Sequence, residues 1–260
     1  MGRTYLDDIV AAHRAVNDPR EWRSRLDGSR YDGPSFADAL RRETVQVIAE
    51  VKRRSPSKGS LAPDLDPAAL AREYADGGAA AISVLTDEQF FGGSLDDLRA
   101  VRVAVDRPIL RKDFTIGEND VLDARDVDAA AVLLIVSVLS DAELASLIAL
   151  ATECGLDALV EVHDEVESQR ALAAGASIIG VNQRDLRSFD VDPERALRIG
   201  ETLPASVITV AESGLRSVAD VERVAAGGFD AVLVGETFVR STSPAALVAE
   251  FAAVARSARA

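Results

Sequence analysis

The chain has 260 residues, enough for one barrel domain of about 250 residues, and its single cysteine excludes an intrachain disulfide and a cysteine-based zinc site. A formal net charge of −14, from 43 acidic residues against 29 Lys plus Arg, argues against nucleic acid or an anionic membrane as a partner. Since no apolar run reaches the roughly 18 residues of a membrane span and the N-terminal segment does not read as a secretory signal, we expect a cytoplasmic protein.

Short apolar runs alternate with longer segments of helical periodicity from residue 45 onward. This alternation is typical of repeated βα units around a parallel sheet. The predicted strands cover residues 45–51, 80–85, 108–112, 130–136, 158–162, 177–182, 206–212 and 231–235. Eight such units without a linker favour a closed (β/α)8 TIM barrel, and no GxGxxG follows the first strand, so a nicotinamide or flavin fold is not expected.

The expected helices carry start signals that precede each helical segment. These are Asp66-Pro67, Ser94 with Asp97, Ser140 with Glu143, Asp164 with Glu167, Asp192-Pro193 and Ser217 with Asp220. Residues 1–44 contain amphipathic stretches and are interpreted as an N-terminal extension of one or two helices packed against the barrel. We therefore expect residues 1–260 to form a single domain.

Barrel active sites form at the C-terminal ends of the strands, so polar residues there are informative. The first strand ends in AEVKRRSPSKG, which puts Glu50 and Lys52 on the same side of the strand, with Ser55 in the turn that follows. Either charge would be costly to bury alone. The pair is consistent with a site residue and its partner, or with a structural ion pair at the barrel rim.

Lysine is rare in this chain, which has it only at positions 52, 58 and 112. Lys112 ends the third strand in LRKDF, on the same face as Phe114. An ammonium differs from a guanidinium because its pKa can be lowered enough to donate a proton, so two rare lysines at strand ends suggest acid chemistry. An acidic, lysine-poor composition also fits a high-salt cytoplasm or an arginine-favouring genome, and the sequence leaves these two open.

Polar residues also mark the ends of the fifth and sixth strands. Glu161 interrupts the apolar run LVEVH and either points into the barrel mouth or is an unexplained buried charge. His163 shares its parity, but a histidine before a helix is more often a surface or capping group, so it is left out of the site. Asn182 and Arg184 share a face in GVNQRDL, where Arg184 either clamps a carboxylate or pairs with an acidic neighbour.

The seventh and eighth strands end in AESGL and VGETF. Small residues at these ends let backbone N–H groups approach a phosphate, and the loops after strands 7 and 8 are the usual phosphate site of such barrels. The candidates are Ser213, Gly214, Gly235 and Glu236. Glu236 is retained only through its backbone N–H, because its carboxylate would repel the ligand.

Taken in order, the segments AEVKRRSPSKG, FFGGS, LRKDF, LVEVH, GVNQRDL, AESG and LVGE resemble the indole-3-glycerol-phosphate synthases over roughly residues 45–240. The resemblance implies decarboxylative ring closure of 1-(2-carboxyphenylamino)-1-deoxyribulose 5-phosphate in tryptophan biosynthesis, with release of carbon dioxide and water. It implies no cofactor and no metal. The implied partner is this phosphorylated small molecule.

The same resemblance implies roles for individual residues. Lys112 would protonate the substrate carbonyl oxygen, and Glu161 would serve the dehydration with Lys52, which Glu50 holds; which lysine acts in which step stays open. The implied binding residues are Ser55, Asn182 and Arg184 for the carboxylate and hydroxyls, Phe91 and Phe114 for the aromatic ring, and Glu212 for the polyol.

Three rival functions fit parts of the pattern. An isomerase of a phosphoribosyl aminoaldose or aminoketose would need an acid–base pair without a carboxylate clamp, and an aldolase would use Lys112 as a Schiff base. A ligand-sensing barrel should have lost Lys112 or Glu161, and both are present. A monomer and a weak oligomer stay open, as does association with other tryptophan-pathway enzymes.

Overall fold

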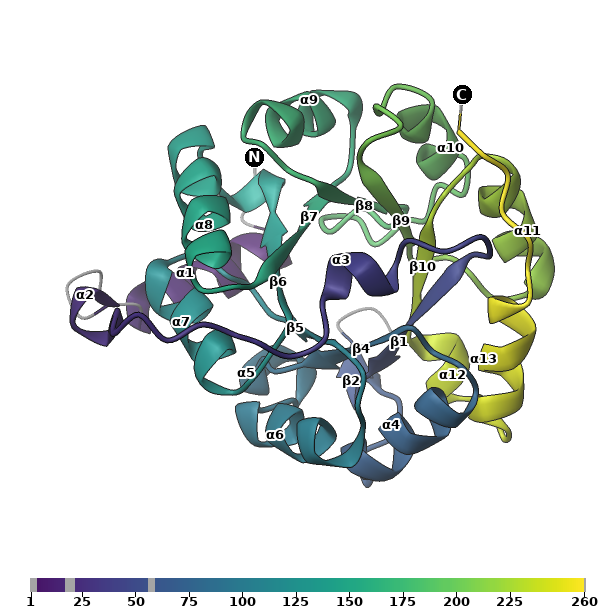
Figure 1. Ribbon diagram of the computed structural model, residues 1–260, viewed down its shortest axis with the longest axis horizontal. Helices are drawn as coiled ribbons and strands as arrows, with labels where there is room; N and C mark the ends of the chain where they lie inside the picture. Colours follow the sequence, from purple (N-terminus) through teal and green to yellow (C-terminus); the bar gives the residue numbers. More distant parts are fainter. Residues whose placement is uncertain (1–3, 17–21, 56–58, 260) are drawn as a thin grey trace.

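Eight parallel strands close into a barrel in the computed structural model, which describes residues 4–16, 22–55 and 59–259. Figure 1 shows the strands in the centre with helices around them. The strands are β1 (Gln46–Val51), β4 (Ala81–Leu85), β5 (Ile109–Lys112), β6 (Ala131–Ile135), β7 (Asp157–Val162), β8 (Ile178–Asn182), β9 (Ile208–Glu212) and β10 (Ala231–Val234). Pairing of β1 with both β4 and β10 closes the ring. The predicted barrel is confirmed, with every strand within two residues of its expected bounds.

The outer layer consists of helices that follow the strands. They are α4 (Pro67–Asp76), α6 (Leu95–Ala104), α7 (Glu118–Asp126), α8 (Asp141–Glu153), α9 (Glu165–Ala173), α10 (Arg195–Gly200), α11 (Val218–Ala226) and α13 (Pro244–Ala252). Short elements in the connections are the hairpin of β2 (Arg54–Ser55) and β3 (Gly59–Ser60), α5 (Glu88–Phe91), the 3₁₀ helix η1 (Val136–Val138) and α12 (Glu236–Val239). Among the described residues, no helix has the length and apolar character needed to cross a bilayer.

The predicted helix starts are confirmed for α4, α6, α8, α9 and α11, where the named Asp or Ser accepts hydrogen bonds from backbone N–H groups of the first turn. The expected start at Asp192-Pro193 is wrong. Helix α10 begins at Arg195, because Asp192 Oδ1 accepts from the N–H of Glu194 at 3.1 Å and closes a turn before the helix.

Side-chain parity along each strand separates the barrel interior from the layer under the helices. On β1, Val47, Ala49 and Val51 pack in the core that contains the helices, whereas Ile48 belongs to the core inside the barrel. Glu50 and Lys52 share the parity of Ile48 and therefore point inward near the end of the strand. The same rule directs Lys112, Glu161, Asn182 and Glu212 into the barrel mouth, since Leu110, Leu159, Ile178 and Val210 precede them on the inner face.

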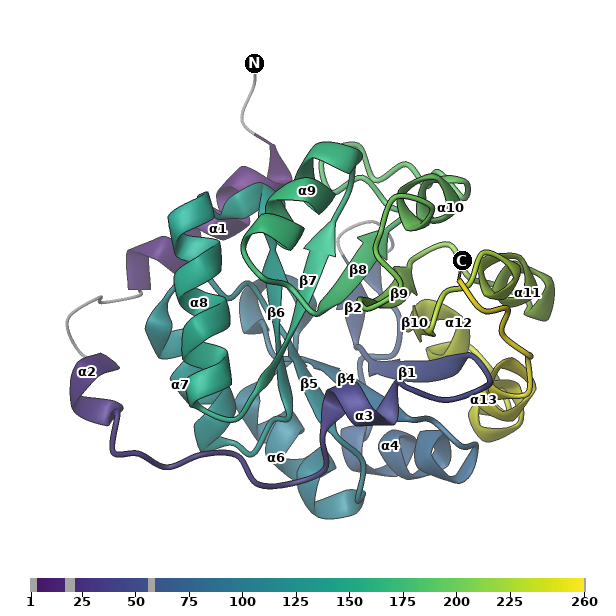
Figure 2. The same cartoon turned by 45° about the horizontal axis from the view of Figure 1, so that its top comes forward.

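The N-terminal segment reaches both ends of the barrel. It forms α1 (Tyr5–Val16) and two single-turn helices, α2 (Trp22–Arg25) and α3 (Phe36–Ala39). The predicted helical extension is therefore present, with three helices where one or two were expected. The N–H of Ala37 donates to Asp157 Oδ2 at the start of β7, so α3 lies at the N-terminal end of the strands, and Figure 2 shows α1 well away from it. Tyr5 of α1 packs edge-on against Phe90, in the loop region after β4.

Candidate active site

A cavity of about 410 Å³ opens at the C-terminal ends of the strands. This volume lies in the range of small-molecule sites. It is lined by every residue that the sequence singled out for the site: Glu50, Lys52, Ser55, Phe91, Lys112, Phe114, Glu161, Asn182, Arg184, Glu212, Ser213, Gly214, Gly235 and Glu236. The structure thus brings together residues from seven of the eight strand ends and the loops that follow them.

Lys112 lines the cavity and lies between two buried carboxylates. Its Nζ lies 3.0 Å from Glu161 Oε2 and 3.6 Å from Glu212 Oε2. Glu161 and Glu212 are 1% and 2% exposed, so neither charge is solvated by bulk water. A substrate that enters here meets one ammonium and two carboxyl groups within contact distance of one another.

The lowered pKa that would make a lysine a ready proton donor is not found at Lys112. Burial lowers its pKa, but the surrounding carboxylates of Glu161, Glu212 and Glu50 outweigh burial and raise it well above its ordinary value. Burial raises the pKa of Glu161, yet Lys112 and His163 outweigh burial and lower it. Burial together with the charge of Glu161 raises the pKa of Glu212 to about 8, against the opposing effect of Lys112. Near neutral pH, Lys112 and Glu161 are therefore charged and Glu212 is mostly protonated.

The second lysine forms its own ion pair on β1. Lys52 Nζ donates to Glu50 Oε1, as the parity of the two residues predicts, and Glu50 is 5% exposed. Gly235 makes room for this pair, because a Cβ at that position would lie 2.3 Å from Glu50 Oε1 and 3.0 Å from Lys52 Nζ. The glycine that the sequence suggested for phosphate binding also accommodates the ion pair.

Asn182 and Arg184 form the wall next to Glu161. Asn182 Nδ2 donates to Glu161 Oε1 at 3.0 Å, and Asn182 Oδ1 accepts from the N–H of Arg184 at 3.0 Å. Arg184 Nη1 donates to the carbonyl of Phe189 at 2.9 Å. Arg184 forms no ion pair with an acidic residue in the described part of the chain, so the alternative structural pairing is not found. Its guanidinium can therefore bind an anionic ligand.

The loops after β9 and β10 continue the cavity lining from the neighbouring strands. Ser213 and Gly214 both have left-handed backbone, with φ of 65° and 75°, and a Cβ at Gly214 would lie 2.7 Å from Val191 Cγ1. Glu236 Oε1 pairs with Arg240 Nε at 3.3 Å, so its carboxylate has a cationic partner.

Sequence reasoning missed Arg216 and Arg240, which also line the cavity on this side. Their signal was available in the sequence: Arg216 follows AESGL, and Arg240 stands four residues after Glu236, the spacing of a helical ion pair.

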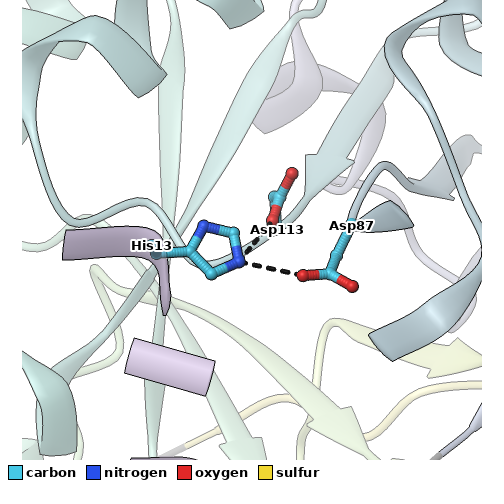
Figure 3. Close-up of side chains that lie close together, drawn as sticks. All are labelled: His13, Asp87 and Asp113. Atoms are coloured by element: carbon cyan, nitrogen blue, oxygen red, sulfur yellow. Dashed lines mark hydrogen bonds and ion pairs between the residues drawn. The ribbon is translucent and has the colours of Figure 1, made fainter. Parts of the chain in front are cut away.

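His13 of α1 forms an ion pair with two aspartates in the loops after β4 and β5, and Figure 3 shows its ring directed at Asp87 and Asp113. His13 Nε2 lies 2.9 Å from Asp87 Oδ2 and 3.8 Å from Asp113 Oδ1. Asp87 Oδ1 accepts from the N–H groups of Phe90 and Phe91, and Asp113 Oδ1 accepts from the N–H of Phe114. The two aspartates therefore connect His13 to both aromatic residues that the sequence placed in the site, and the His13 ring is 5.6 Å from that of Phe114.

Among the described residues, His13, Asp87 and Asp113 form the cluster that could hold a metal ion, because one nitrogen or oxygen atom of each lies within 4.8 Å of the others. Each carboxylate oxygen already accepts a hydrogen bond, since Asp113 Oδ2 accepts from Thr86 and from Arg111. The hydrogen bond that His13 donates to Asp87 raises the pKa of His13, with Asp113 adding to the shift and burial opposing it. We therefore interpret the group as an ion pair of an imidazolium with aspartate.

His163, which sequence reasoning also left out of the site, contacts Glu161. Its Nε2 lies 3.4 Å from Glu161 Oε1. His163 is not among the residues that line the cavity, so it contacts Glu161 from outside the cavity. The parity shared with Glu161 was the available signal.

Comparison with known proteins matches the family model "Indole-3-glycerol phosphate synthase" over residues 7–251. The chain is 48% identical to the indole-3-glycerol phosphate synthase of Micrococcus luteus over 254 residues, covering 98% of this chain and 90% of that protein. It is 53% identical to that of Mycobacterium avium over 253 residues, covering 95% and 93%.

Two solved structures share the barrel at low identity. The thiamine phosphate pyrophosphorylase of Pyrococcus furiosus matches with a TM-score of 0.61 and 19% identity, covering 82% of this chain and 95% of that one. The N-acetylmannosamine-6-phosphate 2-epimerase of Clostridium perfringens matches with a TM-score of 0.63 and 14% identity, covering 80% and 93%. These likenesses support the fold alone. The family model and the near full-length relatives go further: this chain belongs to the indole-3-glycerol phosphate synthases, carboxy-lyases of tryptophan biosynthesis.

Proposed function

We propose that Lys112 is the acid of the ring-closing step. The observation that carries this role is the position of its ammonium in the cavity lining, 3.0 Å from Glu161 and 3.6 Å from Glu212. As the ring carbon that bears the carboxylate attacks the C2 carbonyl, negative charge develops on the carbonyl oxygen. An alkoxide is a far stronger base than an amine, so Lys112 can protonate it although its pKa is raised.

Loss of carbon dioxide from the attacking carbon then restores the benzene ring, and Glu161 serves the dehydration that completes the indole ring. Its carboxylate is ionised and can therefore take up a proton from the substrate while the hydroxyl leaves as water. It also lies within hydrogen-bond distance of Lys112. Lys52, held by Glu50, supplies the acid for that hydroxyl. Glu212, mostly protonated near pH 7, is suited to donate a hydrogen bond to the polyol.

The rest of the cavity provides substrate binding. Arg184, whose guanidinium has no carboxylate partner among the described residues, is suited to the anthranilate carboxylate together with Asn182 and Ser55. The rings of Phe91 and Phe114, 6.3 Å apart, offer an apolar wall to the aromatic ring. Ser213, Gly214, Gly235 and the N–H of Glu236 form the phosphate end, with Arg216 and Arg240 beside them.

The raised pKa of Lys112 disfavours the aldolase alternative, because a Schiff base needs a neutral amine. The test adds 1-(2-carboxyphenylamino)-1-deoxyribulose 5-phosphate and follows indole fluorescence for the wild type and Lys112→Ala. We expect product from the wild type and a rate lower by two to four orders of magnitude in the variant, roughly the contribution of a general acid. Full activity of Lys112→Ala would remove the role assigned to Lys112.

A further inference from the structure

The carboxylate of Glu161 has different partners on its two oxygens. Oε2 faces Lys112, the proposed acid, at 3.0 Å. Oε1 accepts from Asn182 Nδ2 at 3.0 Å and lies 3.4 Å from His163 Nε2. Among the described residues, Lys112 and His163 are thus the titratable cations in contact with Glu161, one on each oxygen.

His163 is held in place from the other side by α9. Its Nδ1 lies 3.0 Å from Glu167 Oε2, and that same oxygen accepts from the backbone N–H of His163 at 2.8 Å. The side chain is 11% exposed, and Nε2 makes no hydrogen bond within the described part of the chain, so the ion-pair contact with Glu161 is its nearest polar interaction. The ring is therefore fixed with Nε2 directed at Glu161.

The groups that face His163 are predominantly acidic. They are Glu161 on β7, Glu167 on α9 and, at longer range, Asp185 in the connection after β8, whose pKa His163 helps to lower. Burial lowers the pKa of His163, but Glu161 and Glu167 outweigh burial and raise it to about 10. His163 is therefore an imidazolium throughout the neutral range, unlike an ordinary histidine.

This charge matters when Lys112 reacts. Once Lys112 gives its proton to the substrate oxygen, the amine is neutral and Glu161 loses the cation on its Oε2 side. We propose that His163 is a positioning residue, whose imidazolium keeps Glu161 ionised and oriented while Lys112 is deprotonated. The inference rests on the proposed roles of Lys112 and Glu161. It assigns no substrate contact to His163, which acts through Glu161 alone.

The kinetic test uses His163→Gln, which keeps a neutral N–H donor but removes the charge. We expect kcat to fall roughly ten- to a hundredfold, as for groups that orient a functional ligand, with KM within about threefold of the wild type. The acidic limb of the kcat profile should move to higher pH, because loss of a neighbouring cation raises the pKa of Glu161.

Asp164→Ala is the matched control, since Asp164 caps the same start of α9 without contacting Glu161. It should lower thermal stability and leave the acidic limb unmoved. If His163→Gln keeps the wild-type kcat and pH profile, or if Asp164→Ala shifts the limb equally, His163 has only a structural role and the inference is wrong.

A direct measurement needs no activity. The chain has two histidines, so ¹⁵N-histidine NMR of the wild type shows two rings, and a His13→Gln variant assigns them. We expect the ring of His163 to stay protonated through pH 8 and its pKa to fall in Glu161→Gln. Titration of His163 near the ordinary value of about 6.5 would overturn the inference. An inactive wild type with a protonated His163 would instead count against the proposed function alone.

Discussion

The carboxylate of Glu212 occupies the space that the missing side chain of Gly180 leaves open. A Cβ at residue 180 would lie 2.1 Å from Glu212 Oε1. Both residues point into the barrel, on the adjacent strands β8 and β9. Glu212 Oε1 is buried without a hydrogen bond in the described chain, so the shape of this space contributes to where the carboxyl group lies beside Lys112.

Gly180→Ala should therefore reduce activity more than stability. The obstructing atom is the end of a flexible side chain, so Glu212 can move away at little cost to folding. A displacement of about 1 Å at a reacting centre can lower the rate about a hundredfold, and we expect a fall in kcat/KM of that order. Steady-state kinetics and a thermal melt of the same preparation measure both effects.

A double-mutant cycle provides the control. Gly180→Ala should have little further effect in a Glu212→Ala background, where no carboxylate remains to be displaced. An equal loss of kcat/KM in both backgrounds would mean that the added methyl group acts on another part of the site.

Lys112→Arg tests proton donation separately from charge. Arginine keeps the positive charge beside Glu161 and Glu212, but its guanidinium does not give up a proton. We expect kcat at least a hundredfold below the wild type, with little change in the melting temperature. Lys112→Met should in addition destabilise the fold, but by less than the roughly 3–5 kcal/mol expected for an unpaired buried charge, since Glu161 keeps His163 as a cationic neighbour. Retention of kcat within a fewfold in Lys112→Arg would argue that Lys112 acts as a charge only.

The sequence predicted the barrel and the inward direction of the main site residues because both depend on local periodicity. An apolar run fixes which residues of a strand face inward, and a charged residue of the same parity at its C-terminal end then points into the mouth. Glu50, Lys112, Glu161 and Glu212 all follow this rule. That these side chains meet in one cavity follows from the closed barrel, because all eight strands end at the same rim.

Contacts between distant segments could not be predicted in this way. His13 reaches Asp87 across 74 positions of sequence, and no local pattern encodes that distance. The raised pKa of Lys112 could not be inferred either, because it depends on three carboxylates from three different strands. Their combined effect follows from the spatial arrangement and not from the spacing on any one strand.

The ion pair of His13 makes the attachment of α1 depend on pH. The folded-state pKa of His13 is raised, so its contribution to stability is fully present below the ordinary pKa of about 6.5 and is lost as pH rises through the raised value. Burial raises the pKa of Asp87, but His13 and backbone N–H groups outweigh burial, and the net pKa is lowered. The contribution of Asp87 to stability is therefore lost as pH falls through the lowered pKa. Attachment should be strongest between these limits.

His13→Gln should flatten this dependence. We expect the free energy of unfolding to change by on the order of 1 kcal/mol below pH 6.5 and by progressively less at higher pH. Hydrogen exchange of the α1 amides at two pH values, with wild type and variant compared, reports the attachment itself. Equal exchange rates in the two proteins at pH 6 would show that His13 does not fasten α1.

Glu236 provides a last test at the proposed phosphate end. Its carboxylate pairs with Arg240 at 3.3 Å and so neutralises a cation that lines the cavity. Glu236→Gln frees Arg240 and removes a negative charge, an effect of about 1 kcal/mol between groups about 4 Å apart in water. We expect KM to fall by about fivefold with kcat unchanged, and Arg240→Ala to raise KM by about tenfold. Because both effects are electrostatic, they should shrink as KCl is raised. A higher KM in Glu236→Gln would mean that the carboxylate is needed to orient the loop. Arg240 would then not be a phosphate-binding residue.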